Sequence, residues 1–299
     1  MITLVDLSRM NVHQEINNEK TVYSLTQFKN DIKYLIFSLA NGMIKIYILK
    51  ENKYEQFQIL EKPIYIRRGE INKVITLSDG KLATAERGVI SIWRPIGENS
   101  EKKFEFYKEI ETYNDTCQLL EINPRVFACA IYKSKLIKVF KKSEGEYSLL
   151  GEISNVESHG EDSNGMAKIN DKLFCSGGKN GFIYIVSVEP IRIIQKIRLS
   201  EYSYVKFLHN SNDGFIFAGI DDNIIQFKII YDKNENFVNL EKFDKIKHGE
   251  NSKAITTTND GKIFYKKNIE NYNEKSIFIL KDYKHYYDFQ LKINKYINY

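Results

Sequence analysis

The stretch from Asp79 to Trp93 reads DGKLATAERGVISIW and decides the fold. A turn pair at Asp79-Gly80 precedes a short apolar segment from Leu82 to Ala85. A second turn at Arg87-Gly88 leads into an alternating segment from Val89 to Trp93. Gly and Asp are common in tight turns, and alternation of apolar and polar residues favours a half-buried strand. The stretch therefore predicts a β-hairpin.

The same hairpin pattern returns along the chain at intervals of roughly 40 to 50 residues, the period of a four-stranded propeller blade. Asn41-Gly42 and Asn180-Gly181 mark the corresponding turn in two other copies, because an Asn-Gly pair supplies the positive φ angles of a type I′ turn. The unit around the first stretch divides into Ile71–Leu77, Leu82–Ala85, Val89–Trp93 and Phe104–Ile110. Trp93, the only tryptophan, is expected to pack between two such units.

We therefore expect an all-β fold, a single β-propeller of four-stranded blades that spans residues 1–299. Six repeats and two N-terminal strand candidates, Ile2–Leu7 and Val12–Ile16, favour seven blades, with six as the alternative. The chain ends are expected to share or flank one blade, because closure removes the exposed edge of a sheet. Second strands such as Leu35-Ile36-Phe37 are apolar at successive positions, which predicts burial on both faces.

Composition narrows the class of protein. The formal charge of +5 comes from 44 basic and 39 acidic residues, and this mixed surface does not indicate nucleic-acid binding. Cys117, Cys129 and Cys175 are odd in number and far apart, which favours a reducing, intracellular location. No apolar segment approaches the roughly 18 residues that span a bilayer. We therefore expect a cytoplasmic protein without a transmembrane segment.

The residues that close the third strands carry a resemblance to a known family. Where WD40 repeats have Trp-Asp, this chain has Trp93-Arg94, Tyr47-Ile48, Phe140-Lys141 and Val186-Ser187. With the spacing and the paired turns, these positions make the chain resemble a WD40-repeat β-propeller with degenerate repeats. The resemblance implies a non-catalytic scaffold that docks peptides or domains within a larger complex. Since the family's His and Asp are missing, its buried hydrogen-bond network is not carried over to these positions.

The binding candidates lie on loops that lead into the first strand of a blade. Such loops present side chains on a rigid framework, and Tyr and Arg are common anchors at interfaces. The candidates are Arg67, Arg68, Glu70, Tyr113, Asp115, Glu161, Asn164, Tyr202, Tyr204 and Asn251. The expected partner is another protein, and no cofactor, metal or nucleic acid is expected.

One motif supports an alternative, a phosphoinositide-binding propeller. Ile66-Arg67-Arg68-Gly69 is similar to the Phe-Arg-Arg-Gly motif of propellers that bind phosphoinositide head groups. In those propellers adjacent arginines contact phosphates. Here Ile66 replaces the aromatic residue, and the motif comes early in the repeats.

A propeller hydrolase is a further alternative, but the sequence offers little chemistry for it. The five histidines, His13, His159, His209, His248 and His285, are scattered without metal-ligand spacing and are interpreted as surface or turn residues. Ser158 and His159 are followed by carboxylates, yet the strained Gly-x-Ser-x-Gly turn of serine hydrolases is missing. The glycine-rich loop at 176–181 lacks the spacing of a phosphate-binding loop and is interpreted as a blade turn.

Overall fold

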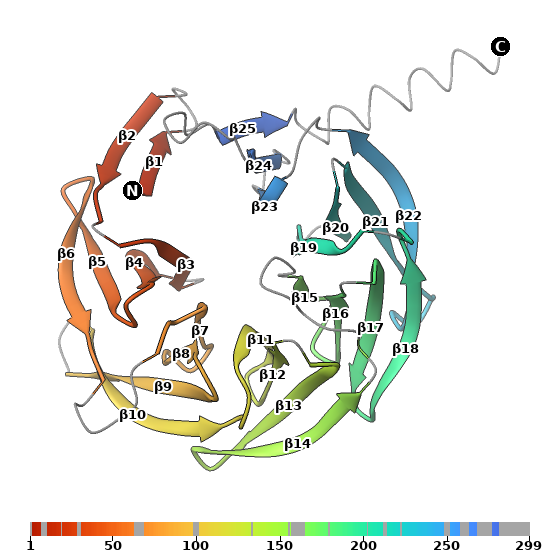
Figure 1. Ribbon diagram of the computed structural model, residues 1–299, viewed down its shortest axis with the longest axis horizontal. Coiled ribbons are helices and arrows are strands. Elements are labelled where there is room, and N and C mark those ends of the chain that lie inside the picture. The colour runs from red at the N-terminus through yellow and green to blue at the C-terminus, as the bar shows by residue number, and fades with distance from the viewer. Residues whose placement is uncertain are drawn as a thin grey trace. The chain divides into compact units, whose positions relative to one another are not determined.

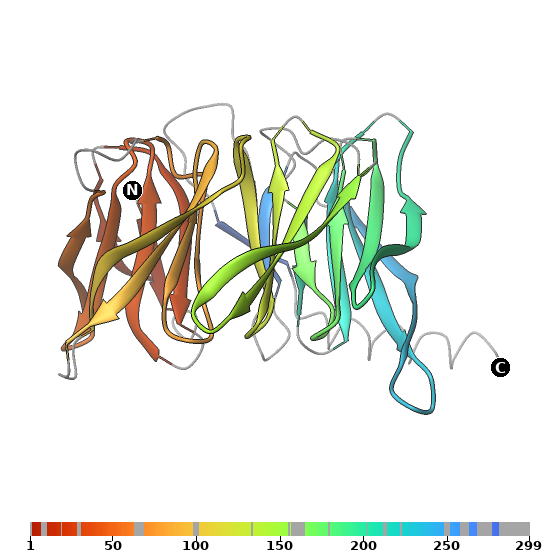
Figure 2. The ribbon, with the colours of Figure 1, turned by 90° about the horizontal axis from the view of Figure 1, so that it is seen from below.

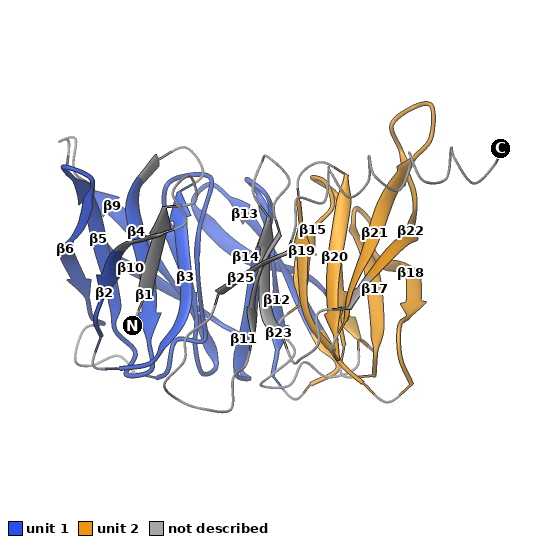
Figure 3. Cartoon of the chain, turned by 90° about the horizontal axis from the view of Figure 1, so that it is seen from above, with its two compact units in different colours: residues 1–132, 137–152 blue, residues 133–136, 153–299 orange. Residues whose placement is uncertain are grey.

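Every element described in the computed structural model is a β-strand, and the strands form seven sheets (Figure 1). The described residues are 2–6, 11–18, 20–28, 31–62, 69–97, 102–132, 134–154, 156, 165–178, 180–201, 203–211, 214–221, 223–247, 252–257, 263–267 and 277–280. Two compact units divide the chain, residues 1–132 with 137–152 and residues 133–136 with 153–299 (Figure 3).

The first unit begins with a two-stranded sheet and continues with three four-stranded sheets, in which the strands lie in chain order. The two-stranded sheet comprises β1 (Ile2–Asp6) and β2 (Asn11–Ile16). The next comprises β3 (Val22–Phe28), β4 (Asp31–Leu39), β5 (Ile44–Lys50) and β6 (Lys53–Leu60). The remaining two are β7 (Lys73–Thr76), β8 (Leu82–Ala85), β9 (Val89–Ile96) and β10 (Lys103–Glu111), then β11 (Thr116–Asn123), β12 (Val126–Ile131), β13 (Leu136–Ser143) and β14 (Glu146–Ser154).

The second unit contains two four-stranded sheets and a three-stranded sheet, again with the strands in chain order. The first comprises β15 (Met166–Lys168), β16 (Leu173–Gly177), β17 (Phe182–Val188) and β18 (Ile191–Arg198). The second comprises β19 (Val205–Asn210), β20 (Phe215–Ile220), β21 (Asn223–Tyr231) and β22 (Phe237–Lys247). The last comprises β23 (Ser252–Thr257), β24 (Ile263–Lys267) and β25 (Ile277–Leu280). Figure 2 shows the strands of each four-stranded sheet side by side.

The strand pattern confirms the repeats that the sequence predicts. β8 has the predicted bounds, and β7, β9 and β10 differ from the prediction by one to three residues at their ends. Asn41-Gly42 forms the turn between β4 and β5, as predicted, but only Gly42 has a positive φ, of 79°, so the predicted type I′ turn, which needs positive φ at both residues, is wrong. The seven sheets of the described residues are consistent with seven blades.

The cores lie between the faces of neighbouring sheets. In the first unit, Ile36 and Ile46 of one sheet share a buried cluster with Val74, Trp93 and Phe104 of the next. Trp93 is 1% exposed, which confirms its predicted burial. In the second unit, a cluster joins residues of β16 and β17 to residues of β19, β20 and β21. Every residue of β8, β12 and β16 is buried, so the expectation of second strands buried on both faces holds.

Glutamine side chains join the last strands of successive sheets within each unit. The Gln58 amide on β6 donates to the carbonyl oxygen of Phe104 on β10 at 2.8 Å and accepts from the Phe104 N–H at 2.9 Å. Gln14 on β2 makes the same pair of bonds with the backbone of Tyr54 on β6, both at 2.7 Å. In the second unit, Gln195 on β18 accepts from the Leu240 N–H on β22 at 3.1 Å. These bridges satisfy backbone groups at sheet edges that the ladders leave unpaired.

We expect Gln58→Ala to lower the free energy of unfolding by about 1 to 2 kcal/mol, because it leaves two Phe104 backbone groups without their partner. Gln56→Ala, on an exposed position of the same strand, is the matched control and should change stability by under about 0.5 kcal/mol. Urea unfolding of both variants measures the difference. Equal stability of the two variants would show that water replaces the Gln58 amide without cost.

His209 corrects one expectation from the sequence. We interpreted it as a surface or turn residue, but it lies within β19, opposite Phe217 on β20. Its side chain is partly buried, and burial lowers its pKa to about 4. The cause is position: β19 is the first strand of its sheet and packs against β15 and β23, so little of it faces water.

The depressed pKa of His209 predicts a loss of stability in mild acid. The unfolded chain binds a proton at this residue below a pH of about 6.5, whereas the folded chain does so only near pH 4. Protonation of His209 in the unfolded chain should therefore lower the free energy of unfolding by about 2 kcal/mol between pH 7 and pH 5. Below pH 4 the folded chain is protonated too, and this contribution stops changing. Urea unfolding of the parent protein and of His209→Asn at both pH values tests this. The same slope in both proteins would assign the acid sensitivity to other groups.

Candidate functional site

The structure describes four of the ten candidate residues. Glu70, Tyr113 and Asp115 belong to the first unit, and Tyr204 belongs to the second. Tyr204 is half-buried, and the ammonium of Lys206 lies 5.9 Å from its ring centroid. The other six, Arg67, Arg68, Glu161, Asn164, Tyr202 and Asn251, lie outside the described residues. The structure therefore brings together only the three candidates of the first unit.

Hydrogen bonds hold three loop segments of the first unit side by side. The Asn72 N–H donates to the carbonyl oxygen of Ala85 at 2.9 Å, and its side-chain amide donates to that of Thr116 at 3.0 Å. The Thr116 N–H donates to the carbonyl oxygen of Glu86 at 3.1 Å. The segment before β7, the turn between β8 and β9 and the loop between β10 and β11 therefore meet. We call their exposed residues, Glu70, Arg87, Tyr113 and Asp115, the loop cluster.

Tyr113 has a fixed backbone and an exposed ring. Its φ is +63°, a left-handed conformation that costs a non-glycine residue roughly 1 to 2 kcal/mol. The N–H groups of Thr112 and Tyr113 both donate to the carbonyl oxygen of Gly88, at 2.9 and 3.2 Å, and hold this conformation. The side chain is 79% exposed, and the Lys138 ammonium lies 5.6 Å from the ring centroid. A rigid backbone thus presents a large aromatic ring to solvent.

Carboxylates outnumber cations around this ring. Arg87 is 69% exposed in its side chain and makes only a long ion pair with Asp115, 3.5 Å between Nε and Oδ1. Glu70 is also exposed. A hydrogen bond to Glu111 and the charge of that carboxylate raise the pKa of the Tyr113 phenol, so the two side chains are close. Glu111 therefore sets a negative charge beside Tyr113, with the Lys138 ammonium over the ring as the opposing charge, and Glu70 and Asp115 add two carboxylates elsewhere in the loop cluster.

A buried polar network lies directly below the loop cluster. Lys62 Nζ pairs with Glu86 Oε2 at 2.6 Å and with Glu109 Oε1 at 2.5 Å. The Thr84 hydroxyl donates to Glu86 Oε1 at 2.9 Å, and the Trp93 indole N–H donates to Thr84 Oγ1 at 3.3 Å. Burial raises the pKa of the Glu86 carboxyl, and the charge of Lys62 opposes that rise. We expected no buried network of this kind; Lys62 and Glu86 build one without His or Asp.

The space beside this network is small. A cavity of about 20 Å³ is lined by Asn41, Gly42, Met43, Glu61, Lys62, Gly69 and Glu86, which is room for one water molecule. A Cβ at Gly42 would lie 2.4 Å from the carbonyl oxygen of Gly69, so the two loops approach closely. The cavity is therefore too small for an organic substrate.

The three cysteine thiols offer no nucleophile. Burial raises the pKa of the Cys117 and Cys175 thiols to about 12, and it also raises the pKa of Cys129. A buried thiol of this kind is inert, because the thiolate is the reactive form. Among the described residues, no three His, Cys, Asp or Glu side chains gather as metal ligands.

Sequence reasoning missed two residues of this region. Arg87 was interpreted only as half of a turn pair, and no prediction was made for Lys62. The Arg87-Gly88 turn was a usable signal, because a turn next to predicted loop residues places its side chain with theirs. Nothing local marks Lys62, since its partners Glu86 and Glu109 are 24 and 47 residues away.

We expect Lys62→Met to lower the free energy of unfolding by about 3 kcal/mol or more, because it leaves the buried Glu86 carboxylate unpaired. Adding Glu86→Gln should restore most of that loss, since glutamine keeps an acceptor for the Thr84 hydroxyl and carries no charge. Urea unfolding of the single and double variants measures both effects. A double variant no more stable than Lys62→Met would rule out the unpaired charge as the cause.

Comparison with known proteins gives the fold. No protein-family model matches the chain, and no curated protein matches its sequence. The structure is similar to the β-propeller domain of Cps50 (Swd1) from Myceliophteria thermophila, with a TM-score of 0.68 and 12% identity over 91% of this chain and 85% of that domain. The described residues contain no helix that could cross a membrane. At this identity the likeness shows the fold alone: the chain is an all-β protein of the β-propeller class.

Proposed function

We propose that this chain is a non-catalytic scaffold, a WD40-like propeller that docks another protein through the loop cluster. The observation that supports this proposal most is Tyr113. An aromatic residue in a left-handed conformation, fixed by two bonds to Gly88 and largely exposed, carries backbone strain without any packing benefit. Strain of this kind persists where the surrounding structure enforces it, and it concentrates at binding sites. The proposal takes residues 1–299 as one domain located in the cytoplasm.

The charges of the loop cluster favour a basic partner segment. Glu111 lies beside the Tyr113 ring, Glu70 and Asp115 are in the same loop cluster, and among the described residues the ion pair of Arg87 is the long one with Asp115. A Lys or Arg side chain of a partner can pair with these carboxylates and lie over the ring, as cations do on aromatic faces. The Tyr113 ring would then be buried against the partner, and the carboxylates would fix the orientation of the partner segment.

The two alternatives from the sequence gain no support here. Arg67 and Arg68, which the phosphoinositide hypothesis requires, lie outside the described residues. The hydrolase hypothesis requires carboxylates and histidines that hold a metal, and the described residues contain no group of three His, Cys, Asp or Glu side chains that could do so. Both remain sequence-level hypotheses.

We expect Tyr113→Ala to weaken partner binding at least about 30-fold, as loss of a central aromatic anchor does. Tagged parent protein and variant are expressed in the source organism, purified with their partners, and compared by quantitative mass spectrometry. The binding of the recovered partner is then measured by titration. Tyr231→Ala, at another exposed tyrosine, is the matched control and should bind as the parent does.

A second variant tests the charge. Asp115→Lys should weaken the same complex and reduce its sensitivity to salt, because it removes attraction for a basic segment. Full recovery of the partner by Tyr113→Ala, or binding by Asp115→Lys as tight as the parent's, would contradict docking at the loop cluster.

A further inference from the structure

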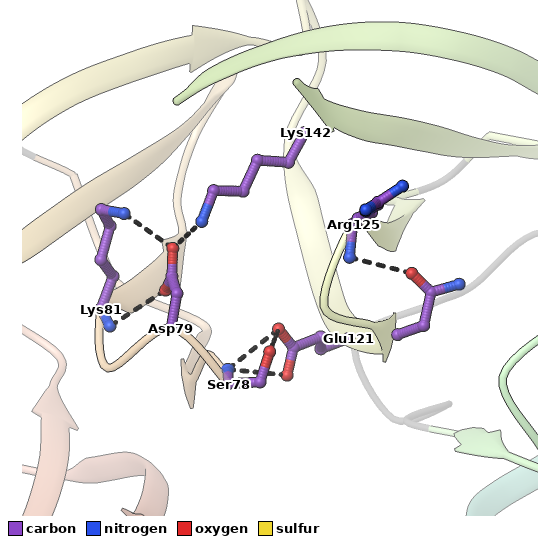
Figure 4. A network of polar contacts seen from close by, with 7 residues as sticks. Ser78, Asp79, Lys81, Glu121, Arg125 and Lys142 are labelled. Carbon is purple, nitrogen blue, oxygen red and sulfur yellow. Dashed lines mark hydrogen bonds and ion pairs between the residues drawn. The ribbon is translucent and has the colours of Figure 1, made fainter. Parts of the chain in front are cut away.

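A shallow pit lies at the other end of β8 from the loop cluster, where the β7–β8 and β11–β12 turns approach each other. Its lining residues are Leu77, Asp79, Glu121, Asn123, Pro124, Arg125, Val126, Phe127, Lys142 and Tyr147, all in the first unit. The Glu121 carboxylate accepts three hydrogen bonds from Ser78, two from its N–H at 3.0 Å and one from its hydroxyl at 2.8 Å (Figure 4). These bonds fix the two turns to each other.

Three cations, Lys81, Lys142 and Arg125, and two carboxylates, Asp79 and Glu121, lie at the mouth of the pit, which leaves one net positive charge. Figure 4 shows Asp79 between two lysines: Lys81 Nζ lies 2.7 Å from its carboxylate, and Lys142 pairs with the same oxygen. Asp79 is therefore more than neutralised. Arg125 is exposed, and within the described residues its side chain has no ion-pair partner. The Lys142 N–H donates to the carbonyl oxygen of Arg125 at 2.7 Å, so these two residues lie side by side at the pit.

The floor of the pit is apolar and holds one unpaired donor. Phe127 meets the edge of the Tyr147 ring, with centroids 5.6 Å apart and planes at 71°. The Tyr147 hydroxyl is hidden from solvent and has no hydrogen-bond partner among the described residues. Burial, followed by the charge of Glu121, raises the pKa of this phenol to about 12, so the group is a donor at neutral pH. The enclosed space, about 10 Å³, has room for a single water molecule that can carry the bond outward.

We propose that this pit is a second docking site, which takes an extended acidic segment of a partner protein. An Asp or Glu side chain of the segment pairs with Arg125 and Lys142, and an adjacent acceptor satisfies the Tyr147 hydroxyl through a water molecule in the pit. Guanidinium groups bind carboxylates with paired, charge-assisted hydrogen bonds. The excess positive charge favours an anionic segment over a basic one. The site is distinct from the loop cluster, whose charges favour the opposite kind of partner.

The first experiment selects peptides that bind the pit from a random library. A phage-displayed library of random 12-residue peptides is panned on the parent protein, after depletion on Arg125→Glu. We expect the selected peptides to be enriched in Asp and Glu. Selection of peptides without acidic enrichment, or failure to select any peptide, would overturn the proposal.

The second experiment locates the binding of a selected peptide by fluorescence anisotropy. Arg125→Glu should weaken it at least about tenfold, because it exchanges an attraction for a repulsion. Arg87→Glu, the same exchange in the loop cluster, is the matched control and should leave the peptide affinity unchanged. An equal loss of peptide affinity in both variants would show that the peptide responds to the overall charge of the protein, and this would overturn the proposal.

Tyr147→Phe separates a ligand role from a structural one. Because the hydroxyl has no partner in the described part of the fold, its removal should leave the thermal midpoint unchanged or raise it. The affinity for the selected peptide should fall about threefold, the effect of a single neutral hydrogen bond. Unchanged peptide affinity in this variant would show that the segment binds outside the pit.

Discussion

Burial of each sheet on both faces is the constraint on which this fold depends. All residues of β8, β12 and β16 are buried, so both faces of a sheet at these strands must be covered by other parts of the protein. Such a sheet becomes stable only when neighbours cover it, and the chain supplies those neighbours by repetition. Side chains that reach water lie in the turns at either end of β8, as Asp79 and Arg87 do. Both surfaces proposed for binding lie at opposite ends of β8 for this reason.

The Lys62 network shows how charged side chains can be buried between the packed sheets. An isolated ammonium or carboxylate inside it would cost several kcal/mol, and each group here has the other as partner. Thr84 and Trp93 extend the pairing from the loop into the sheet. The backbone of Glu86 also accepts the Thr116 N–H, so one residue links the buried network to the loop that carries Tyr113. The geometry of the loop cluster therefore depends on the buried Lys62–Glu86 ion pair, which a docked partner would not contact.

The strands were predictable because their signals are local. The alternation from Val89 to Trp93 and the turn at Asn41-Gly42 each specify structure within a few residues. The bridging glutamines were not predictable, since Gln58 and its exposed neighbour Gln56 look alike in sequence, and only sheet stacking decides which one reaches Phe104. For the candidate site, loop position was enough to find Tyr113. The burial of Lys62 and the strain at Tyr113 are set by residues far along the chain.

The glutamine bridges also affect how this protein behaves at high concentration. The last strand of a sheet normally offers free N–H and C=O groups, and a strand of another molecule can add to them. At Tyr54 and Phe104 those groups are already taken by a side chain of the same molecule. An incoming strand would have to displace both bonds at once before it could extend the ladder. The glutamine side chains that link the sheets thus also hinder aggregation through the edge strands.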